Sequence, residues 1–170
     1  MDLILIRHAE AYERDHGRWP DDRERPLTPR GVKRFRRMAR ALAAVLPEKT
    51  VVWSSALQRA WQTAVILANE ANVVAPAACR PLEPGGSPVA IVRRVNSQPD
   101  ATGIVLVGHE PELGHIAAHY LIGRAGRTTN GLIGFKKGGA ACIRFEAEAK
   151  PGGGVLLWLV TPRLLLDGSG

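Results

Sequence analysis

Residues 3–10, Leu-Ile-Leu-Ile-Arg-His-Ala-Glu, begin with four branched apolar residues that pass directly into Arg7 and His8. A short, wholly apolar run is typical of a strand buried on both faces of a sheet, as in parallel sheets covered by helices. In open parallel sheets, ligands bind beyond the carboxyl ends of the strands. A cation and an imidazole at such an end therefore predict a binding or catalytic site there.

The same arrangement recurs at two further apolar segments. Residues 50–55 (TVVWSS) predict a second strand, which is followed by Arg59 at the start of a helix. Residues 103–109 (GIVLVGH) predict another strand, which ends in His109. If these strands are parallel neighbours, one sheet edge collects two arginines and two histidines, namely Arg7, His8, Arg59 and His109.

Helical and strand patterns alternate along the chain. Helices are predicted at 30–46, 57–72, 88–98 and 112–123. Residues 73–87 predict a weaker strand followed by a Pro/Gly loop, and 138–148 and 153–160 predict two strands that form a hairpin. Thr28 and Pro29 are typical of a helix cap and a first helical residue. These patterns predict an α/β three-layer sandwich: a mostly parallel central sheet, helices on both faces and a C-terminal β-hairpin. We expect one domain over residues 1–170, and the tail at 163–170 stays unassigned.

The chain has 170 residues, of which 45% are hydrophobic and 23% are charged, enough to build a core. Its net charge of +7 favours anionic partners. Much of this charge lies on the helix at 30–46, opposite its apolar stripe, as a solvated face or as a docking patch for an acidic partner. A nucleic-acid site is not expected, because aromatic residues for base stacking are not interleaved with these cations.

Neither a membrane span nor a targeting segment is expected from the sequence. No apolar run approaches about 20 residues, and the first residues lack the charged region and cleavage site of a signal peptide. We therefore expect a cytoplasmic protein that does not contact membranes. Cys79 and Cys142 form no Cys-x-x-Cys pair, so neither a disulfide framework nor a zinc site is predicted.

Two arginines and two histidines at one edge suit phosphoryl chemistry. Arginine presents a fork of donors that matches phosphate oxygens, and two arginines neutralise a dianion. A metal ion is disfavoured because the predicted site is strongly cationic. A neutral imidazole that attacks phosphorus fits better, and neighbouring arginines keep it neutral by disfavouring imidazolium.

Four sequence blocks resemble the histidine phosphatase superfamily, and most of all its short, SixA-type phosphohistidine phosphatases. The blocks are RHAE at 7–10, LTPRG at 27–31, SSALQRAWQT at 54–63 and GHEPEL at 108–113. The resemblance implies that His8 is the nucleophile of a phosphohistidine intermediate and that Arg7 and Arg59 hold the phosphoryl oxygens. It implies a protonated His109 as the second histidine of the pocket, and no metal or cofactor. Ala9 and Ser55 depart from the common Gly and Pro of the family, but both are small.

The family usually supplies a carboxylic acid that protonates the leaving oxygen. Glu83 is the best positional match, with Glu10 and Glu110 as rivals. Ser54 is expected to cap the following helix rather than to bind phosphate. Lys136 and Lys137 either border the pocket or lie on a solvated turn, and His115 and His119 lack a third metal ligand.

The combined prediction is a metal-independent phosphatase that acts on phosphohistidine in a protein or on a small phosphorylated molecule, most simply as a monomer. The alternative is a non-catalytic phosphate- or phosphoprotein-binding module with the same fold. A mutase is disfavoured because the chain is too short to enclose its substrate. A nucleic-acid binder would need a recognisable motif, which is missing.

Overall fold

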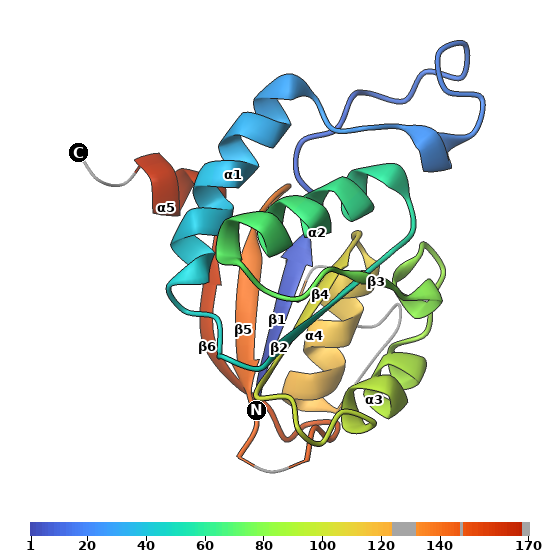
Figure 1. Cartoon of the computed structure of the whole chain (residues 1–170). Coiled ribbons are helices and arrows are strands. Elements are labelled where there is room, and N and C mark those ends of the chain that lie inside the picture. Colours follow the sequence, from blue (N-terminus) through green and yellow to red (C-terminus); the bar gives the residue numbers. More distant parts are fainter. Residues whose placement is uncertain (124–131, 147, 168–170) are drawn as a thin grey trace.

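The computed structural model describes residues 1–123, 132–146 and 148–167, and its centre is one six-stranded sheet (Figure 1). The strands are β1 (Asp2–Arg7), β2 (Thr50–Ser54), β3 (Ala77–Ala78), β4 (Gly103–Gly108), β5 (Ala140–Arg144) and β6 (Val155–Val160). Their order is β3-β2-β4-β1-β5-β6. The first four strands are parallel and the C-terminal pair β5 and β6 is antiparallel, as predicted.

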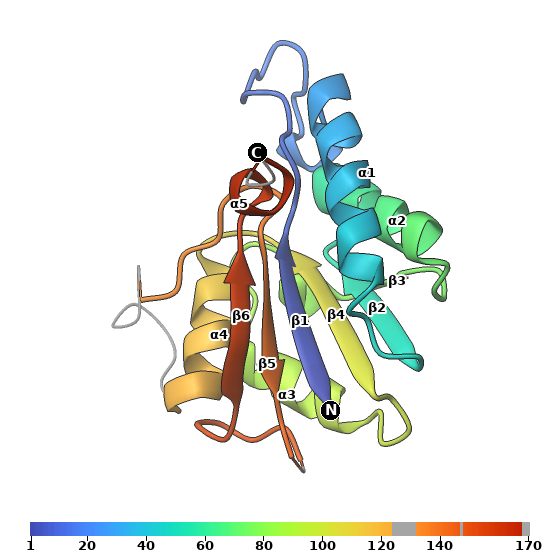
Figure 2. The same cartoon turned by 90° about the vertical axis from the view of Figure 1, so that its left-hand side faces the viewer.

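Helices cover both faces of this sheet, which confirms the predicted three-layer sandwich (Figure 2). They are α1 (Pro29–Ala43), α2 (Gln58–Ala71), α3 (Pro88–Asn96), α4 (Glu112–Ile122) and α5 (Pro162–Asp167), with 3-10 turns η1 (Asp22–Glu24) and η2 (Arg80–Leu82). Helices α1 and α2 lie on one face, and α3 and α4 lie on the other. No helix in the described ranges is both long enough and apolar enough to cross a membrane.

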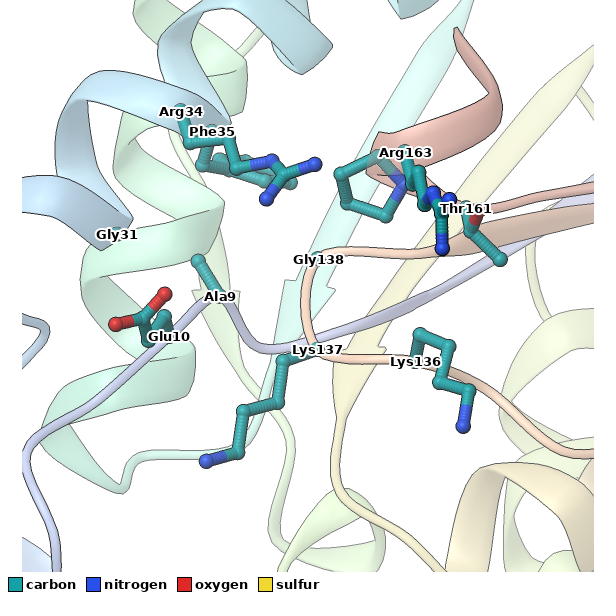
Figure 3. Close-up of a pocket in the computed structure, with 11 residues that line it drawn as sticks. Ala9, Glu10, Gly31, Arg34, Phe35, Lys136, Lys137, Gly138, Thr161 and Arg163 are labelled. Atoms are coloured by element: carbon teal, nitrogen blue, oxygen red, sulfur yellow. The ribbon is translucent and has the colours of Figure 1, made fainter. Parts of the chain in front are cut away.

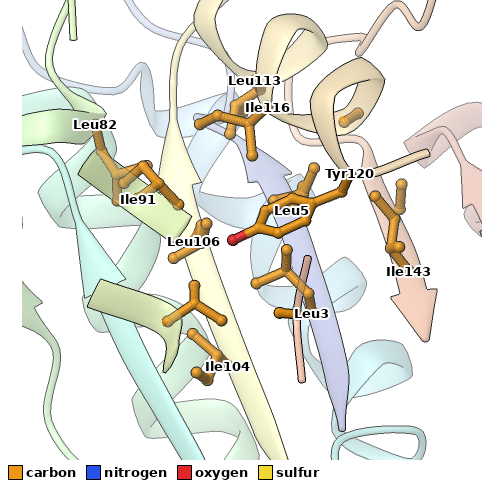
Figure 4. Packing of buried hydrophobic residues seen from close by; sticks show 14 of the residues in the cluster. Leu3, Leu5, Leu82, Ile91, Ile104, Leu106, Leu113, Ile116, Tyr120 and Ile143 are labelled. Carbon is orange, nitrogen blue, oxygen red and sulfur yellow. The ribbon is translucent and has the colours of Figure 1, made fainter. Parts of the chain in front are cut away.

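Strand β1 feeds both hydrophobic cores, because successive side chains of a strand point to opposite faces. Ile4 and Ile6 pack with α1 and α2, whereas Leu3 and Leu5 pack with α3 and α4 (Figure 4). All four are at most 1% exposed. The wholly apolar run at the start of the chain is thus explained by burial on both faces.

The start of α1 follows the predicted capping chemistry. The Thr28 hydroxyl accepts a hydrogen bond from the Gly31 amide at 2.9 Å, and Pro29 is the first helical residue. The helix ends at Ala43, three residues before the predicted end. The residues that follow Ala43 leave the helix in a tight turn, in which the Val45 amide donates to the Leu42 carbonyl at 2.9 Å.

Three segments differ from the sequence prediction. The weaker strand predicted at the start of 73–87 is reduced to two residues, because Val74 is exposed and Pro76 has no amide proton to donate to a ladder. Strand β5 is shorter than 138–148 and its pairing with β6 shifts register between Cys142 and Ile143. The unassigned tail begins with the short helix α5, and residues 168–170 lie outside the described ranges.

Candidate active site

The carboxyl ends of β1 and β4 place two histidines side by side. Arg7 pairs with Gly108 in the strand register, and the His8 amide donates to the Gly108 carbonyl at 3.0 Å. The residues that follow, His8 and His109, then have ring centroids 5.2 Å apart with an interplanar angle of 54°. The parallel neighbours that the sequence prediction required are therefore present.

The His8 ring is held by the backbone of the next residue. Its Nδ1 atom lies 2.8 Å from the Ala9 carbonyl oxygen, which can only accept a hydrogen bond. Nδ1 therefore carries the proton, and Nε2 keeps its lone pair. Burial, and next the charges of Arg59, Arg7 and Arg25, lower the pKa of His8 to about 3, which keeps the ring neutral. This carbonyl is the acceptor that the sequence could not name.

His109 makes a different contact. Its Nε2 atom lies 2.9 Å from the Ser55 hydroxyl, and its buried Nδ1 has no hydrogen-bond partner among the described residues. Burial, followed by His8, Arg59 and Arg7, lowers the pKa of His109 to about 3. The ring is neutral in this arrangement, and the protonated His109 that the resemblance implies stays a prediction.

Arg59 enters the site from the first turn of α2 and is 4% exposed. Its Nη1 donates to the Asp22 carbonyl at 2.9 Å and lies 3.2 Å from the Asp22 carboxylate. Its Nε is buried without a partner in the part of the chain that the structure describes. One guanidinium edge is thus fixed by protein, while a further N–H remains for an anion.

Thr63 connects α2 to the end of β1. Its hydroxyl donates to the Arg59 carbonyl at 2.7 Å and accepts from the Ala9 amide at 3.0 Å. Threonine hydroxyls on helices commonly bond to the carbonyl four residues earlier, and here the same oxygen also reaches the neighbouring strand. Thr63 therefore fixes the position of Arg59 relative to Ala9, whose carbonyl holds the His8 ring.

Sequence analysis missed Asp22 and Arg25, which sit in the polar loop before α1. The Asp22 carboxylate lies 2.7 Å from Arg25, 3.2 Å from Arg59 and 3.6 Å from Arg14. Its hydrogen bond to Arg25 and the neighbouring arginine charges lower the pKa of Asp22, although burial opposes the shift. Arg25 is 9% exposed and donates to the Tyr12 carbonyl at 2.6 Å. Their spacing of three residues was the only sequence signal, and the surrounding prolines made the segment look like an ordinary loop.

Arg7 points to the loop before β5. Its Nη1 donates to the Phe135 carbonyl at 2.7 Å, and its buried Nε has no partner within the described ranges. The Phe135 amide in turn donates to Glu110 Oε1 at 2.6 Å. Glu110 therefore fixes the loop that orients Arg7. A pocket of about 280 Å³ between them is lined by Arg7, Glu110, Ile133, Gly134, Phe135 and Lys136.

The three candidate acids differ in their surroundings. Glu110 accepts hydrogen bonds from two backbone amides, those of Phe135 at 2.6 Å and Gly114 at 3.4 Å. Glu10 is half-buried and lies 3.8 Å from Arg30. Glu83 accepts from Arg23 at 2.9 Å, and Arg23 neighbours Asp22 in η1. Glu83 is thus linked through η1 to the segment that holds Arg59.

Other predicted side chains are also placed by the structure. The Ser54 hydroxyl donates to the Ser55 carbonyl at 2.9 Å, so the expected Ser54 cap is wrong. The Ser55 hydroxyl instead accepts from the Leu57 amide at 3.3 Å. Lys136 and Lys137 line a separate pocket (Figure 3). In the described part of the chain, no group of three His, Cys, Asp or Glu side chains could hold a metal ion.

Comparison with known proteins agrees with this geometry. The family model of the histidine phosphatase superfamily (branch 1) matches residues 3–81. An uncharacterized protein of Picosynechococcus sp. is 34% identical over 173 residues, which cover 98% of this chain and 99% of that protein.

Two solved structures show the same fold. The putative phosphohistidine phosphatase SixA from Nakamurella multipartitia is 26% identical, with a TM-score of 0.74 and 95% of each chain covered. The protein histidine phosphatase SixA complexed with tungstate is 23% identical, with a TM-score of 0.81, over 97% of this chain and 99% of that chain. The chain therefore belongs to the histidine phosphatase superfamily, in its short SixA-type branch, and is a phosphatase.

Proposed function

We propose that this phosphatase works without a metal or organic cofactor and transfers the phosphoryl group of its substrate to His8. The observation that carries the proposal is the fixed His8 tautomer. Nδ1 is committed to the Ala9 carbonyl, so Nε2 is an unprotonated nucleophile. A nucleophilic imidazole must present such a lone pair to phosphorus.

The reaction then proceeds in two displacements. His8 Nε2 forms a bond to phosphorus while the bond from phosphorus to the leaving group breaks, and the leaving group takes up a proton. Water next attacks the phosphohistidine, releases inorganic phosphate and returns the electron pair to Nε2. Arg7 and Arg59 stabilise the charge on the equatorial oxygens, which is the main task of a protein in phosphoryl transfer.

His109 takes its role when an anion lies between the two rings. A phosphoryl dianion beside the buried imidazole favours imidazolium, which opposes the lowering of its pKa by burial and arginines. The ring would then carry a proton toward the phosphoryl oxygens. Protonation of His109 in this proposal thus follows substrate binding and does not precede it.

Glu83 is our proposed donor of the proton to the leaving group. Its carboxylate contacts Arg23, whose side chain is 53% exposed. Solvent screens this ion pair, so breaking it costs little free energy. A phosphohistidine substrate has a good leaving group and needs little acid assistance. The role of Glu83 therefore grows as the leaving group becomes poorer.

The proposed substrate is phosphohistidine in a protein or a small phosphorylated molecule. The similar solved structures named above are SixA proteins, and one of them is described as a protein histidine phosphatase. A cytoplasmic location, a monomeric state and the lack of a nucleic-acid or membrane partner remain predictions from the sequence.

The decisive experiment is hydrolysis of para-nitrophenyl phosphate in the presence of a chelator. We expect turnover by the wild type, with a phosphoryl label on the protein that is acid-labile and alkali-stable. We expect His8→Ala to abolish both turnover and label. His16→Ala, which alters an exposed histidine outside the site, serves as the matched control and keeps both.

Three results would contradict the proposal. Loss of activity on chelation would show that a metal ion takes part. An active His8→Ala protein would remove His8 as the nucleophile. An inactive wild type that still binds tungstate or phosphate would support the binding-module alternative.

A further inference from the structure

A second pocket lies beside the proposed active site at the same edge of the sheet (Figure 3). It encloses about 320 Å³ between the end of β1, helix α1, the loop before β5 and the start of α5. Its lining begins at Ala9, two residues after the end of β1. Beneath it, Ile6 pairs with Ala140 and Ala140 pairs with Val160. None of Arg7, His8, Arg59 and His109 lines it.

The pocket is joined to the active site by the backbone. The Gly138 amide donates to the Arg7 carbonyl at 3.1 Å and to the His8 carbonyl at 3.0 Å. Ala9, whose carbonyl orients the His8 ring, lines the pocket. Lys136 lines both this pocket and the pocket that contains Arg7. The loop that contains Lys136 and Gly138 therefore borders both places.

The lining combines an apolar floor with a cationic rim. The floor includes Phe35, which is 2% exposed, together with Ala9 and Pro162. The rim carries four cations and one carboxylate, namely Arg34, Lys136, Lys137, Arg163 and Glu10. In Figure 3 the Arg34 side chain extends from α1 toward α5, and the Arg163 side chain lies beside Thr161.

Lys137 and Glu10 form only long ion pairs with partners in the described part of the chain. Glu13 lies 3.8 Å from Lys137 and is 95% exposed, and Glu10 lies 3.8 Å from Arg30. Ion pairs at such separations in solvent are weak and exchange readily. An excess of cations over an apolar floor suits an anion that is carried on a short apolar stem, such as a carboxylate side chain.

We propose that this pocket binds a carboxylate of the same molecule whose phosphoryl group is transferred to His8. The inference rests on the proposed function and deepens it, because it makes acidic substrates the preferred class. In a protein substrate the carboxylate is an Asp or Glu side chain near the phosphohistidine. In a small substrate it is the acid group of a phosphorylated carboxylic acid.

The test compares matched substrate pairs. One pair is a phosphohistidine peptide flanked by glutamates and the same peptide flanked by glutamines, and the other is phosphoglycerate and glycerol phosphate. We expect the wild type to prefer the acidic member of at least one pair by about tenfold in kcat/KM, as a charged hydrogen bond supplies. The pair that shows the preference identifies the source of the carboxylate.

We expect the double variant Lys137→Ala/Arg163→Ala to lose this preference. The control variant Lys33→Ala/Arg36→Ala removes the same amount of charge from exposed positions of α1 outside the pocket. We expect this control to keep the preference for the acidic substrate. Equal preference in the two double variants, or no preference in the wild type, would overturn the inference while the proposed function stands.

Failure of the proposed function gives a different result, namely no hydrolysis of any substrate, including para-nitrophenyl phosphate. Calorimetric titration of His8→Ala with the two unphosphorylated peptides then decides the pocket separately. Tighter binding of the glutamate peptide, lost on adding Lys137→Ala/Arg163→Ala, supports the carboxylate site. Equal binding of both peptides overturns it.

Discussion

The two histidines of the site are buried, although their charged forms would be better solvated by water. His8 and His109 are 7% and 3% exposed, and Arg59 and Arg7 lie close enough to influence both of them. Burial and positive charge both disfavour imidazolium, so both rings stay neutral well below the ordinary pKa of histidine. A nucleophile that is ready at neutral pH is the functional result.

This protonation state makes stability depend on pH. The pKa of each ring is about 3 in the folded chain, against the ordinary value of 6.5 for an exposed histidine. Below pH 6.5 the unfolded chain therefore binds protons that the folded chain cannot bind. Stability is complete above that pH and is lost as the pH falls toward 3. We expect a loss of about 1.4 kcal/mol per pH unit for each histidine.

Urea unfolding at about pH 7 and about pH 5 measures this loss. The double variant His8→Gln/His109→Gln should show a smaller difference between the two conditions. The lowered pKa of Asp22 acts only below its ordinary 3.8, so it contributes little in this window. The same pH dependence in wild type and variant would show that other groups cause it.

At the scale of elements, the site depends on links between segments that lie far apart in the chain. Thr63 ties α2 to the residue after β1, and Gly138 ties the loop before β5 to the carbonyls of Arg7 and His8. The two pockets lie on either side of this loop and share Lys136. A substitution that breaks one of these hydrogen bonds therefore displaces residues that are remote from it in the sequence.

We expect Thr63→Val to destabilise the protein by about 1–3 kcal/mol, because the buried Ala9 amide loses its acceptor. Activity should fall as well, because Ala9 orients His8. Chemical unfolding together with kcat/KM for an aryl phosphate measures both effects. Thr102→Val, at an exposed threonine, is the matched control and should change both little. A Thr63→Val protein as stable as the control would refute the structural role.

At the scale of the whole molecule, charge is spread unevenly relative to the sheet. The net charge is +7, and the proposed active site and the second pocket lie at the same edge with arginines and lysines around both. Strand β6, at the opposite side of the sheet from β3, is apolar, with Val155 and Leu157 exposed. The cationic edge should therefore attract anionic substrates.

We expect kcat/KM for an anionic substrate to fall several-fold when salt is raised from about 0.05 M to about 0.5 M. Shortening of the Debye length from about 14 Å to about 4 Å screens this attraction. Steady-state rates at constant pH measure the effect, and the fall should be steeper for phosphoglycerate than for glycerol phosphate. Rates that are independent of salt would show that the surface charge does not guide the substrate.

The sequence by itself determined the layered α/β fold and the meeting of its arginines and histidines at one sheet edge. The short apolar runs at Leu3–Ile6 and 103–107 are typical of buried strands, and a residue directly after such a strand must lie at its carboxyl end. For this reason the grouping of His8 with His109 was predictable without coordinates. The single domain over residues 1–170 remains a prediction, in keeping with one sheet that contains every described strand.

Only the tertiary structure decided what each of these groups touches. The Ala9 acceptor, the pairing of Asp22 with Arg59 and Arg25, and the neutral state of His109 depend on contacts between loops and helices. Side-chain contacts and desolvation depend on distances of a few ångströms across segments that are remote in the chain. Local periodicity and composition carry no record of those distances, so the sequence located the site while the packing set its chemistry.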